Sequence, residues 1–266
     1  MRPSEFTERV LFYSTDSDYN FNFGVYLMKL NDFTLRFLAT VFCVVFLVGC
    51  NEKQDSTTGN YPPDSSQDKW GQFALVVIGT QNYFWNDSLA EQFPDFPKNI
   101  SELLKFCRAE GIDIIHLRAR FDPDMSNWPS CYKLAGKIPC VKGTEEEKAE
   151  PFARELPGET VIYKHSFDGF LDTGLADYLD KHNKKHLLVA GLDSGVCVLS
   201  TCFTAFQKGY LLTLLEDCCA GEINGYKFVT QYYNGFLFET IRFENIDDNY
   251  ASWMERLDRL ESVSKR

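Results

Sequence analysis

The chain has 266 residues, a formal net charge of −11, and 44% hydrophobic and 15% aromatic residues. This length fits one large domain or two small ones, and the apolar share suffices for a sizeable core. The acidic balance argues against a nucleic-acid groove, which needs a clustered basic face, and it points to no particular substrate.

The N-terminal part of the chain differs in composition from the rest. Residues 37–50, FLATVFCVVFLVGC, carry no charge and are fewer than the roughly 20 needed to span a bilayer. They suit the apolar core of a secretory signal that starts at Met28 and has Lys29 and Arg36 as its basic flank. The final LVGC resembles a bacterial lipoprotein signal, in which Cys50 is lipidated.

This interpretation divides the chain into three parts. Residues 1–50 are an upstream extension and a lipoprotein-type signal, residues 51–69 are a polar tether, and residues 70–266 are one folded domain. We expect an exported protein that is anchored to the membrane through lipid on Cys50, in the periplasm or at the cell surface. Secretion and an uncleaved signal-anchor helix are the alternatives.

Nine cysteines occur in the sequence, and none of them forms a CxxC pair. Zinc ribbons and thioredoxin-like redox motifs are therefore not indicated. Cys131 and Cys140 flank a short loop and are candidates for a disulfide if the protein is exported. The alternative is that most of the cysteines are small buried apolar residues.

Apolar runs alternate with amphipathic stretches through the folded part. One helix is indicated by apolar residues on a single face, with Asn99 and Glu102 as a capping box, and another is capped by Thr173. The alternation predicts a doubly wound α/β domain with a mostly parallel sheet of five to six strands and helices on both faces. The expected strands are 73–78, 112–117, 160–163, 186–190, 210–215 and 236–242, and the expected helices include 98–110, 196–208 and 250–260.

Functional sites of such sheets lie at the carboxyl ends of the strands. The first strand is followed by Gly79 and the third ends at Lys164. The fourth is followed by GLDSGVCVLS, which places Cys197 in the first turn of a helix capped by Ser194 or Gly195. A helix N-terminus and a nearby ammonium both stabilise a thiolate, so Cys197 is the candidate nucleophile.

Taken together, these motifs resemble the isochorismatase-like cysteine hydrolases, which include nicotinamidases and N-carbamoyl amidohydrolases. ALVVIGTQNYF resembles the first-strand motif of that family, apolar residues followed by D-x-Q-N-D-F. VAGLDSGVCV resembles the turn that carries the nucleophile, and the stretch from Gly143 through LPGETVIYKHSFDGF to Leu175 is similar as well. The resemblance covers roughly residues 70–220, so residues 70–266 are identified as an isochorismatase-like hydrolase domain.

The resemblance implies a triad of aspartate, lysine and cysteine. Cys197 is the implied nucleophile, which forms a covalent intermediate that water then hydrolyses, and Lys164 holds the thiolate. A non-proline cis peptide is implied between Leu192 and Asp193, and the backbone amides of Asp193 and Cys197 are the implied oxyanion hole. The aspartate itself belongs at position 79, where this chain has Gly79.

Loss of the aspartate affects the expected activity. General acid–base catalysis contributes about 10²–10⁴-fold, so we expect an impaired hydrolase of an amide, ureido or related bond, slowest at the water step. One alternative is a catalytically inactive pseudoenzyme that binds a small ligand or a protein partner. Another is a redox-sensing thiol protein that uses Cys197 and Cys202.

The remaining expectations concern ligands and partners. Gln81, Phe84, Trp85 and Trp128 are candidate substrate-binding residues, although core packing is the commoner role of an aromatic side chain. We expect no metal or other cofactor, because metal-dependent members of the family carry histidines after the second strand and LRARFDPDMSNWPSCYKLAGK contains none. The family commonly forms dimers or tetramers, so a homo-oligomer that acts on a small molecule is expected.

Overall fold

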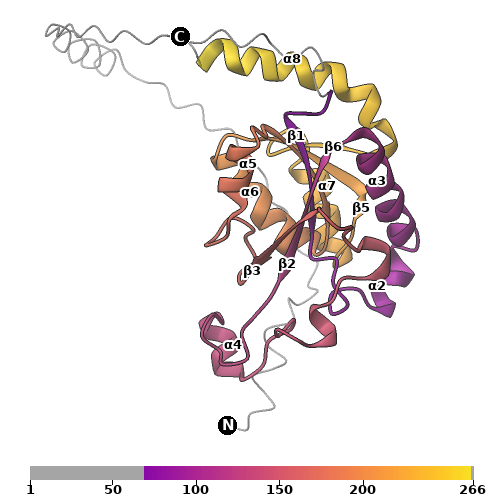
Figure 1. The fold of residues 1–266 in the computed structure, drawn as a ribbon. Coiled ribbons are helices and arrows are strands. Elements are labelled where there is room, and N and C mark those ends of the chain that lie inside the picture. Colours follow the sequence, from indigo (N-terminus) through magenta and orange to yellow (C-terminus); the bar gives the residue numbers. More distant parts are fainter. Residues whose placement is uncertain (1–68, 265–266) are drawn as a thin grey trace, which may run out of the picture. The chain divides into compact units, whose positions relative to one another are not determined.

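The computed structural model describes residues 69–264 (Figure 1). The signal segment, the lipidation of Cys50 and the tether up to residue 68 lie outside the described residues, and they stay predictions. Within the described part, no helix has both the length and the apolar character needed to cross a membrane.

The described residues form a sheet of six parallel strands in the order β3-β2-β1-β4-β5-β6. This arrangement confirms the predicted α/β class. The first and fourth strands are buried along their whole length, as their continuous apolar sequences indicated. The strands are β1 (Phe73–Ile78), β2 (Asp113–Ala119), β3 (Thr160–Lys164), β4 (His186–Gly191), β5 (Leu211–Cys219) and β6 (Glu239–Ile241).

Helices cover both faces of this sheet, so each face has its own apolar core. Successive residues of β1 alternate between the two cores: Phe73 and Leu75 contribute to one, Ala74 and Val76 to the other. In Figure 1, α3 lies on one side of the strands and α5 and α6 lie on the other. The α-helices are α2 (Asp87–Gln92), α3 (Phe96–Glu110), α4 (Ser130–Ala135), α5 (Leu175–Lys181), α6 (Leu199–Gln207), α7 (Ile223–Tyr232) and α8 (Ile246–Ser264).

Short helical turns interrupt the long connection between β2 and β3 and precede two of the helices. Three are 3₁₀ turns, and the fourth is a π-helical turn that leads directly into α6. The π turn is the segment that contains Cys197. These turns are η2 (Glu145–Glu147), η3 (Pro151–Ala153), η4 (Ser194–Val198) and η5 (Phe243–Asn245).

Two local predictions are wrong, and one is confirmed. The helix α3 begins at Phe96, before the predicted capping box, and the Asn99 amide donates to the Asp217 carbonyl at 2.8 Å instead. All seven cysteines of the described residues are free thiols, so Cys131 and Cys140 form no disulfide. The Thr173 hydroxyl does accept a hydrogen bond from the first backbone N–H of α5, at 3.2 Å.

A partly buried ionic cluster fixes the start of β3 to α3 and β2. Glu159 accepts hydrogen bonds from Arg108 at 2.6 and 3.0 Å and from the Leu156 N–H at 2.9 Å, and its carboxylate lies 2.9 Å from His116 Nε2. Burial by itself raises the pKa of the Glu159 carboxyl, but these hydrogen bonds and the Arg108 charge outweigh it and lower the pKa to about 2.

This shift predicts a component of acid unfolding. The ordinary carboxyl pKa is 4.5, so Glu159 stabilises the fold above that pH and loses its contribution as the pH falls towards about 2. We expect Glu159→Gln to be less stable than the wild type at pH 7, by a margin that shrinks on acidification. Urea unfolding of both proteins at several pH values between neutral and acidic measures this difference in the free energy of unfolding. Glu145→Gln, at an exposed pair with Lys148, is the control. A margin that is independent of pH would contradict the assignment.

Candidate active site

The parallel sheet brings three predicted residues to one edge. Gly79 directly follows β1, Lys164 ends β3, and Cys197 lies in the turn η4 that follows β4. Lys164 Nζ lies 3.2 Å from Cys197 Sγ. Both side chains are buried, with 1% of Lys164 and 6% of Cys197 exposed. The nucleophile and the lysine that the sequence predicts are therefore in direct contact.

The surroundings of Lys164 make this contact electrostatically significant. Its Nζ also donates to the Ser166 carbonyl at 2.7 Å. Across residues 69–264, no carboxylate oxygen lies within the 4.0 Å that defines an ion pair with Lys164. A buried ammonium without an anion is costly, and Cys197 Sγ is the side-chain atom that lies in contact with this one.

The turn that carries Cys197 is capped by Asp193. Its carboxylate accepts from the Gly195 N–H at 2.9 Å, and its carbonyl accepts from the Val196 and Val198 N–H groups at 3.1 Å. The prediction that Ser194 or Gly195 caps this segment is therefore wrong. Burial raises the pKa of the Asp193 carboxyl.

The peptide bond that precedes this cap is unusual. The Leu192–Asp193 bond is cis, as the family resemblance implies. The Asp193 N–H has no acceptor among the hydrogen bonds of the described chain, which leaves it available to a ligand oxygen. The role of the Asp193 and Cys197 amides as an oxyanion hole stays a prediction.

Two threonines of α6 hold the turn η4, which contains Cys197, and the loop after β3 together. The Thr201 hydroxyl donates to the Cys197 carbonyl at 2.7 Å and accepts from the Gly169 N–H at 3.0 Å. The Thr204 hydroxyl donates to Asp168 at 2.8 Å. The loop clamped in this way contains the Ser166 carbonyl that Lys164 contacts. Sequence reasoning missed these residues; the signal available was two threonines one helical turn apart, following the nucleophile.

Gly79 is a position where no side chain fits. Its φ of +63° lies in the left-handed region, and a Cβ atom added there would lie 2.5 Å from the backbone oxygen of Leu192. Its N–H donates to the Leu117 carbonyl at 2.9 Å, which fixes the backbone. The carboxylate that the resemblance places here is therefore absent, and the backbone leaves no room for it.

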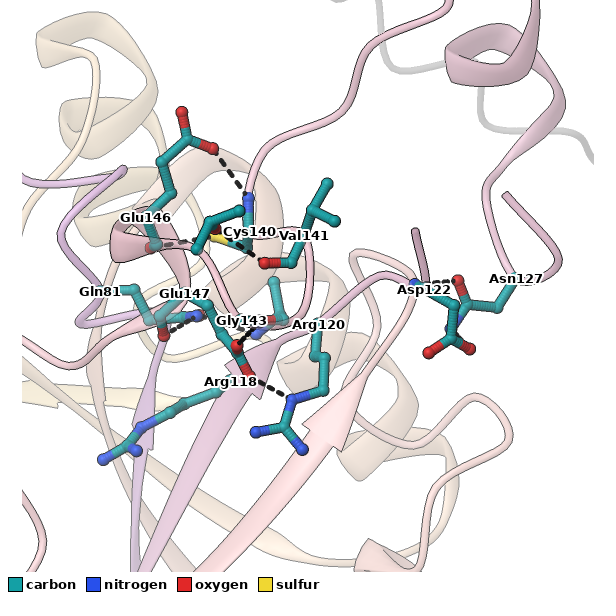
Figure 2. A network of polar contacts seen from close by, with 12 residues as sticks. Gln81, Arg118, Arg120, Asp122, Asn127, Cys140, Val141, Gly143, Glu146 and Glu147 are labelled. Carbon is teal, nitrogen blue, oxygen red and sulfur yellow. Dashed lines mark hydrogen bonds and ion pairs between the residues drawn. The ribbon is translucent and has the colours of Figure 1, made fainter. Parts of the chain in front are cut away.

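Gln81 is a structural tether in this structure. It is fully buried, and its side-chain nitrogen donates to the carbonyls of Ala119 and Glu147 at 2.9 and 2.8 Å. Its side-chain oxygen accepts from the Ala119 N–H at 2.7 Å. Figure 2 shows the surrounding polar network, in which the Glu147 carboxylate contacts Gly143 and Arg120. Because both N–H groups bind backbone, Gln81 has none to offer a substrate.

The three aromatic candidates lie in apolar clusters. The Trp85 ring stacks on Phe96 with centroids 5.1 Å apart, and Phe84 packs against the same core. Trp128 is buried in a smaller cluster formed largely by the long connection itself, where its indole N–H donates to the Asp122 carbonyl at 2.6 Å. Trp128 is thus a core residue, Phe84 and Trp85 are partly buried against the core, and a substrate-binding role of the three stays a prediction.

A cavity of about 420 Å³ lies elsewhere, between the end of α6 and the segment before β6. Tyr210, Phe236 and Arg256 contribute to its lining, and neither Lys164 nor Cys197 does. Its size therefore says nothing about the chemistry at the carboxyl edge of the sheet.

The isochorismatase domain profile matches residues 73–224. YddQ of Bacillus subtilis, an uncharacterized isochorismatase family protein, is 31% identical over 149 residues, which are 55% of this chain and 77% of that protein. Ureidoacrylate amidohydrolase RutB of Cronobacter sakazakii is 25% identical over 171 residues, with coverage of 55% and 73%.

A solved structure has a similar fold. An isochorismatase family protein from Desulfovibrio vulgaris superposes with a TM-score of 0.63 at 24% identity, covering 68% of this chain and 98% of that one. The domain profile spans more than half of this chain, and the parallel sheet agrees with it. The chain therefore belongs to the isochorismatase family.

Proposed function

We propose that this protein is a cysteine hydrolase that cleaves the C–N bond of an amide or ureido group in a small molecule. The observation that carries the proposal is the 3.2 Å contact between Cys197 Sγ and the buried Lys164 Nζ. Similarity to an amidohydrolase that is named for a ureido substrate supports the choice of bond.

The reaction follows from the charges of this pair. The Cys197 thiolate attacks the carbonyl carbon, and the oxygen of the tetrahedral intermediate is stabilised by the Asp193 and Cys197 amides. The C–N bond then breaks, the nitrogen takes up a proton and departs as an amine or ammonia, and a thioester remains on Cys197. Water hydrolyses this thioester, releases the acid and restores the thiolate. Because Gly79 provides no carboxylate, we expect turnover to be slow, with the water step most affected.

The test is a comparison of covalent labelling and turnover in the purified full-length protein. We expect the wild type to hydrolyse members of a panel of small amides, ureido acids and activated esters. Intact-protein mass spectrometry should detect an acyl group on Cys197 during turnover. Cys197→Ala should lose both signals.

Cys202→Ala is the matched control, because Cys202 is also buried and lies five residues further along, on α6. It should keep both the adduct and the turnover. Hydrolysis that survives Cys197→Ala would show that another group does the chemistry. A wild type that gives neither adduct nor product, even with activated esters, would overturn the proposal in favour of a binding protein.

A further inference from the structure

The hydrogen bonding of Cys197 Sγ identifies Lys164 as the candidate for moving protons to and from the reacting groups. In the described part of the chain, the sulfur has a single hydrogen-bond partner, Lys164 Nζ at 3.2 Å. Position 79, which faces the Leu192 carbonyl beside the nucleophile turn, has neither a side chain nor space for one. A general acid or base has to lie within hydrogen-bond reach of the group that it serves, directly or through one water.

Two carboxylates of the long connection, those of Glu146 and Glu147, are engaged elsewhere. Figure 2 shows that Glu146 Oε2 accepts from the Cys140 N–H, at 3.2 Å. The Glu147 carboxylate pairs with Arg120 and accepts from the Gly143 N–H at 2.6 Å. These contacts hold both acids within the connection itself.

The two titratable residues adjacent to the site in sequence are also engaged. The Asp193 carboxylate caps its own turn through the Gly195 N–H and is packed so closely against Gly221 that a Cβ there would lie 2.3 Å from it. His165 Nε2 lies 4.0 Å from the exposed Asp172, which is its ion-pair partner. Neither side chain contacts Cys197 or Lys164.

Lys164 has the features that a proton carrier needs. An ammonium has three N–H groups, and two of those on Lys164 are used by the Ser166 carbonyl and by Cys197 Sγ, which leaves one for a ligand. No carboxylate of the described residues pairs with it, and Cys197 Sγ is the neighbouring atom that carries a negative charge in the proposed reaction. Once the sulfur is acylated, a buried ammonium without an anion remains, and this favours transfer of its proton to the departing nitrogen.

We propose that Lys164 is both the general acid and the general base of the reaction, so that the site works as a Cys–Lys dyad. This inference rests on the proposed function. In the first step the Cys197 S–C bond forms, the C–N bond breaks, and the leaving nitrogen takes a proton from Lys164 Nζ. In the second step water attacks the thioester carbon, its proton passes to the neutral Lys164 amine, and the S–C bond breaks to regenerate the thiolate.

The experiment separates the two steps with p-nitrophenyl acetate, whose leaving group departs as an anion and needs no proton, so that the Lys164 ammonium, left without an anion, gives its proton to solvent instead. The full-length wild type and Lys164→Arg are loaded at about pH 9, where a thiol ionises without help, and are then desalted into neutral buffer. Loss of the acetyl group from Cys197 is followed by intact mass. Arginine keeps the positive charge but does not deprotonate. We expect the arginine variant to keep its acetyl group about 10²-fold longer than the wild type, or more.

A second variant and a control show whether slow deacylation reflects a folding defect rather than the loss of Lys164. Lys164→Gln retains a donor for the Ser166 carbonyl and is smaller than arginine. We expect its acetyl group to be hydrolysed as slowly as that of the arginine variant. This variant tests the proposal if Lys164→Arg does not fold. Lys184→Arg changes another buried lysine, one that pairs with Asp113 at 2.9 Å, and should deacylate at the wild-type rate.

The outcomes distinguish this inference from the proposed function. Deacylation of a folded Lys164 variant at the wild-type rate overturns the role of Lys164 as a base and leaves Cys197 as the nucleophile. A wild type that takes up no acetyl group on Cys197 overturns both. Variants that load one acetyl group and then stall support the dyad.

Discussion

Replacing Gly79 with aspartate is expected to destabilise the fold by about 2–6 kcal/mol and to leave the hydrolysis rate no higher. A non-glycine residue held at a positive φ costs about 1–3 kcal/mol, and overpacking adds about as much. The crowding atom is the Leu192 backbone oxygen, which a change of side-chain rotamer does not relieve. Because Leu192 leads into the turn of Cys197, the backbone shift that relieves the clash also displaces Cys197, the proposed nucleophile.

The measurement is urea unfolding of Gly79→Ala and Gly79→Asp beside a hydrolysis assay of both. Gly111→Ala is the matched control, because Gly111 has a φ of +73° and open space where the Cβ would lie. The excess cost at position 79 then reports the contact with Leu192. A Gly79→Asp variant that folds normally and hydrolyses faster than the wild type would show that the backbone accepts a carboxylate there.

Replacing Gln81 with alanine is expected to cost at least about 3 kcal/mol of folding stability, with a parallel loss of activity. The change leaves the Ala119 N–H, the Ala119 carbonyl and the Glu147 carbonyl without their partner, and a buried unsatisfied polar group costs about 1–3 kcal/mol. The same change disconnects the segment after β1 from the end of β2 and from the long connection.

Measurements of stability and of KM together distinguish a structural role of Gln81 from the substrate-binding role that the sequence suggested. Thermal unfolding and the Michaelis constant are measured for Gln81→Ala and for Asn82→Ala, whose amide makes an exposed hydrogen bond to the Glu145 carbonyl. The Asn82 variant should change little. A Gln81 variant that keeps its stability while its KM rises would mean that the side chain binds substrate after all.

The elements that the sequence predicts well are those whose pattern is set locally. The continuous apolar sequences of β1 and β4 mark strands buried on both faces, and their boundaries agree with the structure to within one residue. The helix α7 has no comparable pattern, because Val229 and Thr230 are its buried residues while Phe228 and Tyr232 are exposed. Its aromatic residues therefore gave no clean amphipathic periodicity.

Some features of the candidate site can also be predicted from the sequence, and others depend on tertiary contacts. Contact between Lys164 and Cys197 follows from sequence because the carboxyl ends of parallel strands meet at one edge. The absence of a carboxylate at position 79 is also visible in sequence. The lack of space there depends on Leu192, more than a hundred residues away, and such a contact leaves no local signal. The tethering by Gln81 and the clamping by Thr201 are likewise set by tertiary contacts.

The contact between Cys197 and Lys164 has a consequence for covalent ligands. In the described part of the chain Lys164 has no carboxylate partner, so a neutral group fixed on Cys197 Sγ leaves a buried ammonium without an anion beside it, and this opposes the binding energy of the ligand. A reagent that carries its own carboxylate one carbon from the sulfur supplies that anion as it reacts. Selective inhibitors of this site are therefore better sought among anionic alkylating agents than among neutral ones.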